Sequence, residues 1–165
     1  MEGAYLCLTN SKRLASSAKL VAESEEEYGL SIFLLIISAE EVAKGFLLAE
    51  NYEQKRPINE DEWIRLTKGK AHIRKLQELR KRIKKYSGKD MFQTFDMQKT
   101  PDGNPPEKVM QRWKEYGLYI EWKQYEWSLY FEKLDSHTRI WMYNRLLEIA
   151  LASIRYLDNY LNKLE

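Results

Sequence analysis

The run SIFLLIISAEEVAKGFLLAE, residues 31–50, decides the fold, because it is the most apolar stretch of the chain and carries three charges at its centre. Apolar side chains would cover nearly every face of a helix built from it, which is typical of a buried helix. We therefore expect a central helix over about residues 30–51. Its charges are Glu40, Glu41 and Lys44, and Lys44 is spaced to reach either carboxylate. Buried charges need partners, so other helices must supply them.

Composition indicates one ordered, mostly helical domain covering residues 1–165. Hydrophobic residues make up 44% and charged residues 32%, with only four prolines and seven glycines. The single cysteine, Cys7, cannot form an internal disulfide, so a cytoplasmic setting is expected. The first residues lack a basic leader followed by an apolar block, and the run 32–37 is too short to span a bilayer. We expect neither export nor membrane insertion.

Helical periodicity predicts an all-α fold, an up-and-down bundle of about four long helices. Residues 87–134 read as an irregular insertion, with a long proline-containing loop, a short helix and a possible β-ribbon or extended arm. A break is expected around Gly29, and Asp135 or Ser136 can cap the last helix. Besides the central helix, the expected helices run from Ala4 to about Glu27, from about Glu60 to about Tyr86, from Glu107 to Tyr116, and from Ser136 to the C-terminus.

Positive charge is concentrated in one window. Residues 65–89 contain eleven Lys or Arg and one Glu, a net charge of +10, although the whole chain carries only +2. Such a block attracts phosphate backbones or an acidic partner, while the simpler alternative is a solvated helix face. The cations expected to face outward and contact RNA are Arg74, Lys81, Arg82, Lys84 and Lys85.

A histidine on the same predicted helix is the best candidate for chemistry. His72 shares the apolar stripe that continues through Leu76 and Ile83, so we expect it to point into the bundle. Lys75 follows His72 within one turn. Arg65 precedes His72 by two turns, so both share a face of the helix if Gly69 does not break it. A histidine beside a carboxylate can act as a general acid or base. The alternative for His72 is a structural histidine in the core, satisfied by hydrogen bonds. The alternative for Glu40, Glu41 and Lys44 is an exposed ion pair within one helix.

Other chemistries find little support. Two histidines and one cysteine give no metal-ligand spacing, and the seven glycines form no phosphate loop. We expect no metal and no cofactor.

Three segments in order resemble the AbiV-type abortive infection proteins, a branch of the HEPN superfamily. They are YGLSIFLLIISAEEVAKGFLL, KAHIRKLQEL and RWKEYGLYIEW, which together cover residues 28–122 with gaps. The residues that carry the resemblance are Glu40, Glu41 and Lys44, then His72 and Lys75, then Arg112, Gly117, Leu118, Tyr119 and Glu121, the last group having no assigned role.

The resemblance implies a HEPN-like helical bundle, often dimeric, in a defence protein associated with halting translation during phage infection. Many HEPN proteins are metal-independent ribonucleases, whose signature is an arginine, a polar residue and a histidine after four to six further positions. Arg65 and His72 keep that gap, but Leu66 stands where the signature has a polar residue. In this reading His72 is the acid or base, and Arg65 or Lys75 stabilises the phosphorane. The residues that fix the histidine are Glu40, Glu41 and Lys44.

Two functions remain open on the sequence. The first is a phage-defence effector that acts on RNA or translation, as a ribonuclease in its catalytic version. The second is a non-catalytic protein that binds RNA, the translation machinery or a phage protein, with the Glu/Lys/His set as a structural network. In either case we expect a homodimer, a phage-encoded activator as a possible partner, and no membrane.

Overall fold

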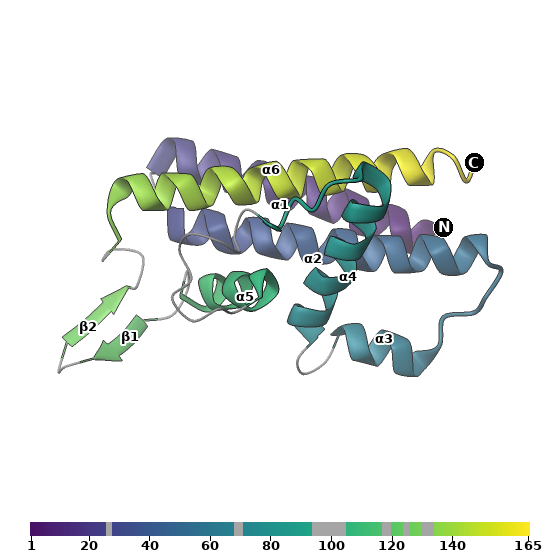
Figure 1. The fold of residues 1–165 in the computed structure, drawn as a ribbon, viewed down its shortest axis with the longest axis horizontal. Coiled ribbons are helices and arrows are strands. Elements are labelled where there is room, and N and C mark those ends of the chain that lie inside the picture. The colour runs from purple at the N-terminus through teal and green to yellow at the C-terminus, as the bar shows by residue number, and fades with distance from the viewer. Residues whose placement is uncertain (26–27, 68–70, 94–104, 117–119, 124–125, 130–133) are drawn as a thin grey trace.

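The structure is a computed structural model of the 165-residue chain. It describes all residues except 26–27, 68–70, 94–104, 117–119, 124–125 and 130–133. Three long helices, α1, α2 and α6, run along the long axis, and both termini lie at the same end (Figure 1). The elements are α1 (Glu2–Glu25), α2 (Tyr28–Glu53), α3 (Glu60–Thr67), α4 (Ala71–Ser87), α5 (Pro106–Tyr116), β1 (Ile120–Lys123), β2 (Glu126–Leu129) and α6 (Ser136–Leu161).

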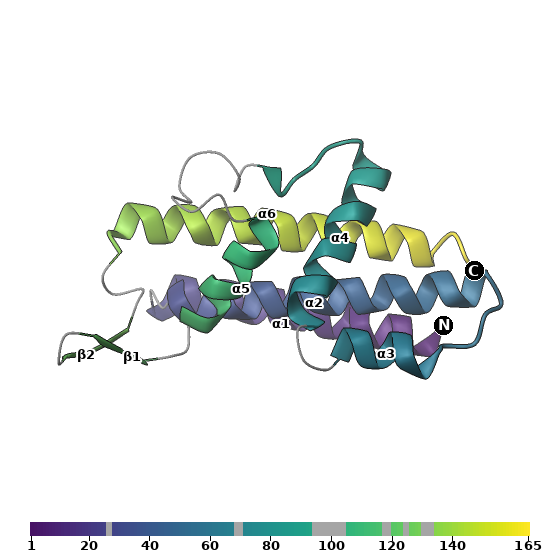
Figure 2. The same ribbon diagram turned by 60° about the horizontal axis from the view of Figure 1, so that its bottom comes forward.

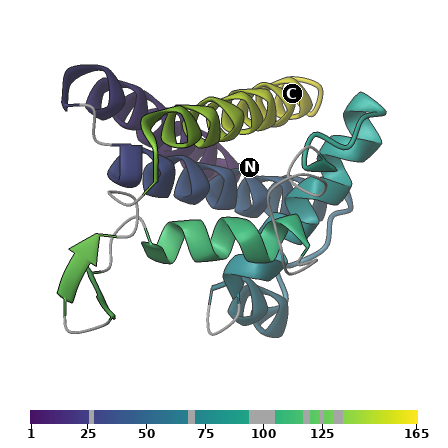
Figure 3. The same cartoon turned by 60° about the vertical axis from the view of Figure 1, so that its left-hand side comes forward.

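Helix α2 is the spine of the molecule, as its sequence predicts. It contacts α1, α6, α4 and α5, with α1 and α6 on one side and α5 and α3 on the other (Figure 3). Its side chains Ile32, Leu35, Ile36 and Phe46 are almost completely buried. Within the described part of the chain, no helix combines the length and the apolar character needed to cross a membrane.

Small side chains let α1 and α2 approach closely. Ala18 of α1 and Ala39 of α2 are fully or almost fully buried, and the hydroxyl of Ser38 donates to the backbone carbonyl of Ser11 at 2.9 Å. At Gly45 a Cβ would lie 2.5 Å from Leu157 Cδ2 of α6. The glycine therefore lets α6 pack against the middle of α2. The break predicted around Gly29 is confirmed: α1 ends at Glu25 and α2 begins at Tyr28, so Gly29 lies in the first turn of α2.

The single helix predicted over residues 60–86 is wrong. The structure has two helices, α3 and α4, which run in different directions in Figures 1 and 2. Gly69, a poor helix former, stands in the sequence between them. Helix α4 crosses α2, and its buried stripe of Leu76, Leu79 and Ile83 packs into the core. Because the chain changes direction between α3 and α4, residues of the two helices do not lie on one helical face.

The C-terminal half follows the prediction more closely. Asp135 caps α6, since its carboxylate accepts from the backbone N–H of Thr138 at 2.8 Å. The strands β1 and β2 pair antiparallel, with Trp122 opposite Trp127, in the region predicted as a ribbon or arm. Residues 94–104 of the predicted proline-containing loop lie outside the described residues. The helical bundle predicted from the sequence is confirmed, with β1 and β2 as a short ribbon beside it.

Candidate functional site

A buried carboxylate stands at the centre of the candidate site. Glu40 lies midway along α2, and only 1% of its surface is exposed. Helices α4 and α5 both pack against α2 and bring basic side chains to this carboxylate. A carboxylate without water is costly to keep ionised unless charged or hydrogen-bonding groups replace the water.

Two lysines supply that compensation. Lys75 Nζ of α4 lies 2.6 Å from Glu40 Oε2, and Lys114 Nζ of α5 lies 3.0 Å from Oε1. Both lysines are only 7% exposed. Each carboxylate oxygen therefore has its own ammonium group, and the three helices α2, α4 and α5 are tied together at one point.

His72 is the member of this group that reaches the surface. It occupies the first turn of α4, and 39% of its side chain is exposed. Its Nδ1 lies 2.7 Å from Glu40 Oε2 and 2.6 Å from Lys114 Nζ. The inner edge of the ring is therefore held by two charged groups. We call Glu40, His72, Lys75 and Lys114 the Glu40 cluster.

Charge in the Glu40 cluster is unbalanced toward positive. Burial by itself raises the pKa of Glu40, but the charge and hydrogen bond of Lys75 and the charge of Lys114 outweigh it. The net result is a pKa below the ordinary value for a glutamate. One carboxylate thus faces two ammonium groups beside a partly exposed imidazole, which suits an anionic ligand or an anionic transition state.

Glu41 and Lys44 do not belong to the cluster. They form an ion pair with each other, with side chains 14% and 19% exposed. Their charges act on Cys7 of α1, where burial, Glu41 and the opposing effect of Lys44 leave the thiol pKa raised. The prediction that Glu41 and Lys44 fix His72 is therefore wrong. Glu41 follows Glu40 by about 100° around the helix, which turns it toward α1 instead of α4.

Arg65 is not placed on the helix that carries His72. It lies in α3, whereas His72 lies in α4, so the predicted face shared over two helical turns does not exist. The side chain of Arg65 is outside the described residues.

Lys114 was missed by reasoning from the sequence, although a signal was present. Glu107, Met110 and Lys114 follow each other at intervals of three and four residues along α5, and all three are buried. The buried carboxylate of Glu107 accepts a hydrogen bond from Arg80 of α4 at 3.3 Å. A lysine on an apolar helical stripe requires a carboxylate elsewhere, and the charges of the central helix were expected to find partners on other helices.

The cations predicted to bind RNA are divided by the structure. Arg74, Lys84 and Lys85 are exposed on α4, and Lys81 is exposed and donates to Glu78. Arg82 is different, because its side chain is only 12% exposed and donates two hydrogen bonds to Glu50 of α2, at 3.0 and 2.6 Å. The prediction that Arg82 faces outward is wrong, since it joins α4 to α2.

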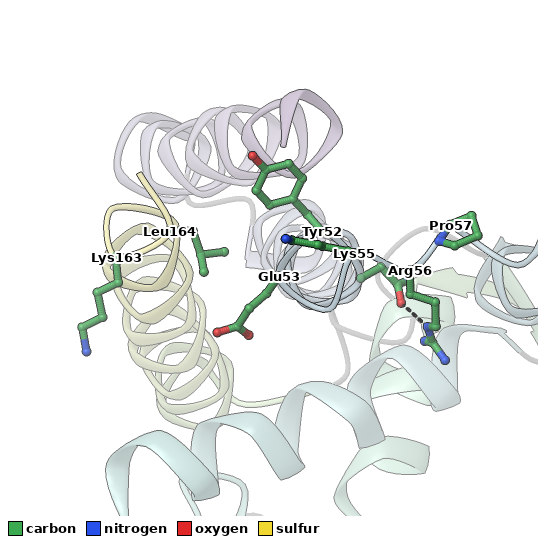
Figure 4. A pocket seen from close by; sticks show the side chains of 8 residues that line it. Tyr52, Glu53, Lys55, Arg56, Pro57, Lys163 and Leu164 are labelled. Atoms are coloured by element: carbon green, nitrogen blue, oxygen red, sulfur yellow. Dashed lines mark hydrogen bonds between the residues drawn. The ribbon is translucent and has the colours of Figure 1, made fainter.

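A separate hollow lies at the ends of α2 and α6. It is lined by Asn51, Tyr52, Glu53, Lys55, Arg56, Pro57, Lys163 and Leu164. In Figure 4, Tyr52, Arg56 and Lys163 point in different directions, and the drawn hydrogen bond joins Arg56 to the Asn51 amide oxygen at 2.8 Å. These side chains do not converge on one position. The Glu40 cluster is therefore the stronger candidate.

Comparison with known families identifies the family of the chain. A model of the HEPN_AbiV family, described as AbiV, matches residues 1–135. The chain belongs to the HEPN AbiV family. No curated protein and no solved structure gives a significant match. At the level of the family, AbiV membership supports a role in abortive infection and phage defence.

The AbiV match includes every residue of the Glu40 cluster and ends at Asp135, immediately before α6. The third segment of the resemblance is only partly described. Arg112 is exposed on α5, two residues before Lys114. Tyr119 lies outside the described residues, and Glu121 lies in β1 with its side chain outside them. Their roles stay unassigned.

Proposed function

We propose that this AbiV protein acts on RNA in phage defence, as a metal-independent endoribonuclease in which His72 transfers a proton. The observation that supports this most directly is the orientation of His72. Nδ1 is held inside by Glu40 and Lys114, while 39% of the side chain is exposed. A histidine that is held at one ring nitrogen and partly exposed is suited to proton transfer.

The reaction that fits these groups is attack of a ribose 2′-oxygen on the neighbouring phosphorus. The bond from phosphorus to the 5′-oxygen breaks, and the products are a 2′,3′-cyclic phosphate and a 5′-hydroxyl. His72 serves as the acid or base of this step. The ammonium groups of Lys75 and Lys114 favour the extra negative charge of the phosphorane, because charges in a site shielded from water interact more strongly.

RNA would be attracted by the outer face of α4. The exposed cations Arg74, Lys84 and Lys85 lie away from the buried stripe of that helix. Their attraction reaches about 10 Å at ordinary salt, so Arg74 acts at the first turn of α4, while Lys84 and Lys85, in its last turn, act on RNA that runs along the helix. The phosphate at His72 itself must be contacted by the Glu40 cluster.

A second candidate is a non-catalytic protein that binds RNA, the translation machinery or a phage protein. The observation in its favour is that Glu40, Lys75 and Lys114 are almost completely buried and satisfy one another. Such a set can hold three helices in register without any reaction. In this version His72 is a contact residue or a structural one.

Both candidates share further proposals. The protein would work in the cytoplasm, where the translation machinery is, and as a homodimer. A phage-encoded protein would activate it. Dimerisation predicts a melting temperature that rises with protein concentration.

The cleavage test uses total RNA and tRNA with excess chelator. The proteins are wild type, His72→Gln and His137→Gln, and the last is a matched control because His137 is the other histidine and is exposed. We expect chelator-resistant cleavage by wild type and His137→Gln and a loss of at least about 100-fold in His72→Gln, the usual size of a general acid or base effect. RNA binding without any cleavage by wild type would reject the ribonuclease and leave the binding protein.

A further inference from the structure

The contacts of His72 Nδ1 cannot all be hydrogen bonds at the same time. Nδ1 lies 2.7 Å from a carboxylate oxygen of Glu40, which only accepts, and 2.6 Å from the ammonium of Lys114, which only donates. A ring nitrogen either carries a hydrogen and donates or has a lone pair and accepts. Glu40 and Lys114 therefore compete for the tautomer of His72.

The two arrangements differ in what remains unsatisfied. If Nδ1 carries the hydrogen, it donates to Glu40, and the Lys114 ammonium faces another donor. If Nδ1 has the lone pair, it accepts from Lys114 but faces the lone pairs of Glu40 Oε2 at 2.7 Å, an oxygen that still accepts from Lys75 at 2.6 Å. Glu40 also accepts from Lys114 through its other oxygen at 3.0 Å. The carboxylate is thus satisfied without the histidine.

We propose that Lys114 is the positioning residue that keeps neutral His72 in the tautomer with its hydrogen on Nε2. The buried ammonium of Lys114 has the stronger need, since a donor–donor contact at 2.6 Å would oppose its positive charge. A hydrogen bond from a charged ammonium to a ring nitrogen is charge-assisted and stronger than a neutral one. The charged groups at Nδ1 are Glu40 from α2 and Lys114 from α5, and Lys75 of α4 binds the same carboxylate oxygen of Glu40.

This tautomer assigns a direction to the proton transfer, and this step rests on the proposed function. Nε2–H gives its proton to the departing 5′-oxygen as the bond to phosphorus breaks. Lys114 passes a proton to Nδ1, so the ring stays neutral and the lysine becomes an amine. Water takes the 2′-hydroxyl proton, and solvent later returns a proton to Nε2 while Nδ1 returns one to Lys114. His72 is then the general acid.

The test is ¹⁵N NMR of the full-length protein labelled at histidine. The chain has two histidines, so His72→Gln assigns both sets of ring signals. The compared proteins are wild type, Lys114→Met, Lys114→Gln and Lys108→Met, which removes an exposed lysine from the same helix. In wild type we expect the ring nitrogen that bears hydrogen at His72 to be Nε2. Lys108→Met should keep this pattern.

Loss of the lysine should reverse the pattern. In Lys114→Met the hydrogen moves to Nδ1, which then donates to Glu40, while Lys114→Gln keeps the wild-type pattern if its amide still donates. A wild-type spectrum with the hydrogen on Nδ1 overturns the proposal. This result does not depend on whether Lys114→Met folds. An unchanged tautomer in folded Lys114→Met overturns it as well. The spectra need no RNA, so a protein that cleaves nothing but shows the expected tautomers would refute the ribonuclease alone.

Discussion

Replacement of Glu40 by glutamine should cost more stability than any other single change of a charged side chain among the described residues. The variant keeps the size of the side chain but leaves the ammonium groups of Lys75 and Lys114, each 7% exposed, without a counter-charge. Breaking one buried ion pair costs about 3–5 kcal/mol. Two pairs share this carboxylate, but the amide oxygen still accepts from one lysine, so we expect about 3–5 kcal/mol in total.

Urea denaturation followed by circular dichroism measures this loss. With a slope of about 2 kcal/mol per molar, typical for a domain of this size, the midpoint should fall by about 1.5–2.5 M. The matched control is Glu41→Gln, because the neighbouring residue forms a single and more exposed pair with Lys44, worth about 1 kcal/mol or less. Adding Lys75→Met to Glu40→Gln should recover part of the loss. Equal midpoints for Glu40→Gln and Glu41→Gln would refute a buried cluster held by Glu40.

Three further predictions follow from the same contacts. Because folding lowers the pKa of Glu40, ionised Glu40 adds to the free energy of unfolding above its unfolded pKa of about 4.3, and this contribution is lost as the pH falls through the folded pKa. In Glu40→Gln the free energy of unfolding should therefore fall less steeply with decreasing pH on the acid side. A slope equal to that of wild type would contradict this. Arg82→Ala should destabilise the protein by about 1.5–3 kcal/mol in urea titrations, because it removes the two hydrogen bonds to Glu50. Lys81→Ala should change the stability little, since Lys81 is exposed. Equal losses in the two variants would contradict the inward placement of Arg82. Gly45→Ala should lower stability by about 1–3 kcal/mol in spite of its better helix propensity, because the new Cβ would meet Leu157 at 2.5 Å, and a stabilised variant would show that α6 packs differently.

Much of the fold could be predicted because the long helices carry local signals. The apolar run of α2 predicts its buried place, and Asp135 predicts the start of α6. The direction change between α3 and α4 could not be predicted from local signals. A glycine in a basic stretch is compatible with a continuous helix or with two helices, and packing against α2 decides between them.

The candidate site was predicted in part. Glu40, His72 and Lys75 come together because their positions lie on the faces of α2 and α4 that meet. The choice between Glu40 and Glu41 as the inward carboxylate depends on how α2 is rotated, which local spacing does not fix. Lys114 is 74 residues from Glu40 in the sequence, and only the tertiary fold brings them to 3.0 Å.

The measurement that tests the central claim most directly is made on His72→Gln, with stability and RNA cleavage determined on the same preparation. His72 is the exposed member of the Glu40 cluster, and glutamine can replace its hydrogen bond to the buried groups. We predict an unfolding free energy within about 1 kcal/mol of wild type together with loss of chelator-resistant cleavage. A variant that cleaves RNA like wild type would contradict the role of His72, as would a loss of cleavage explained by unfolding.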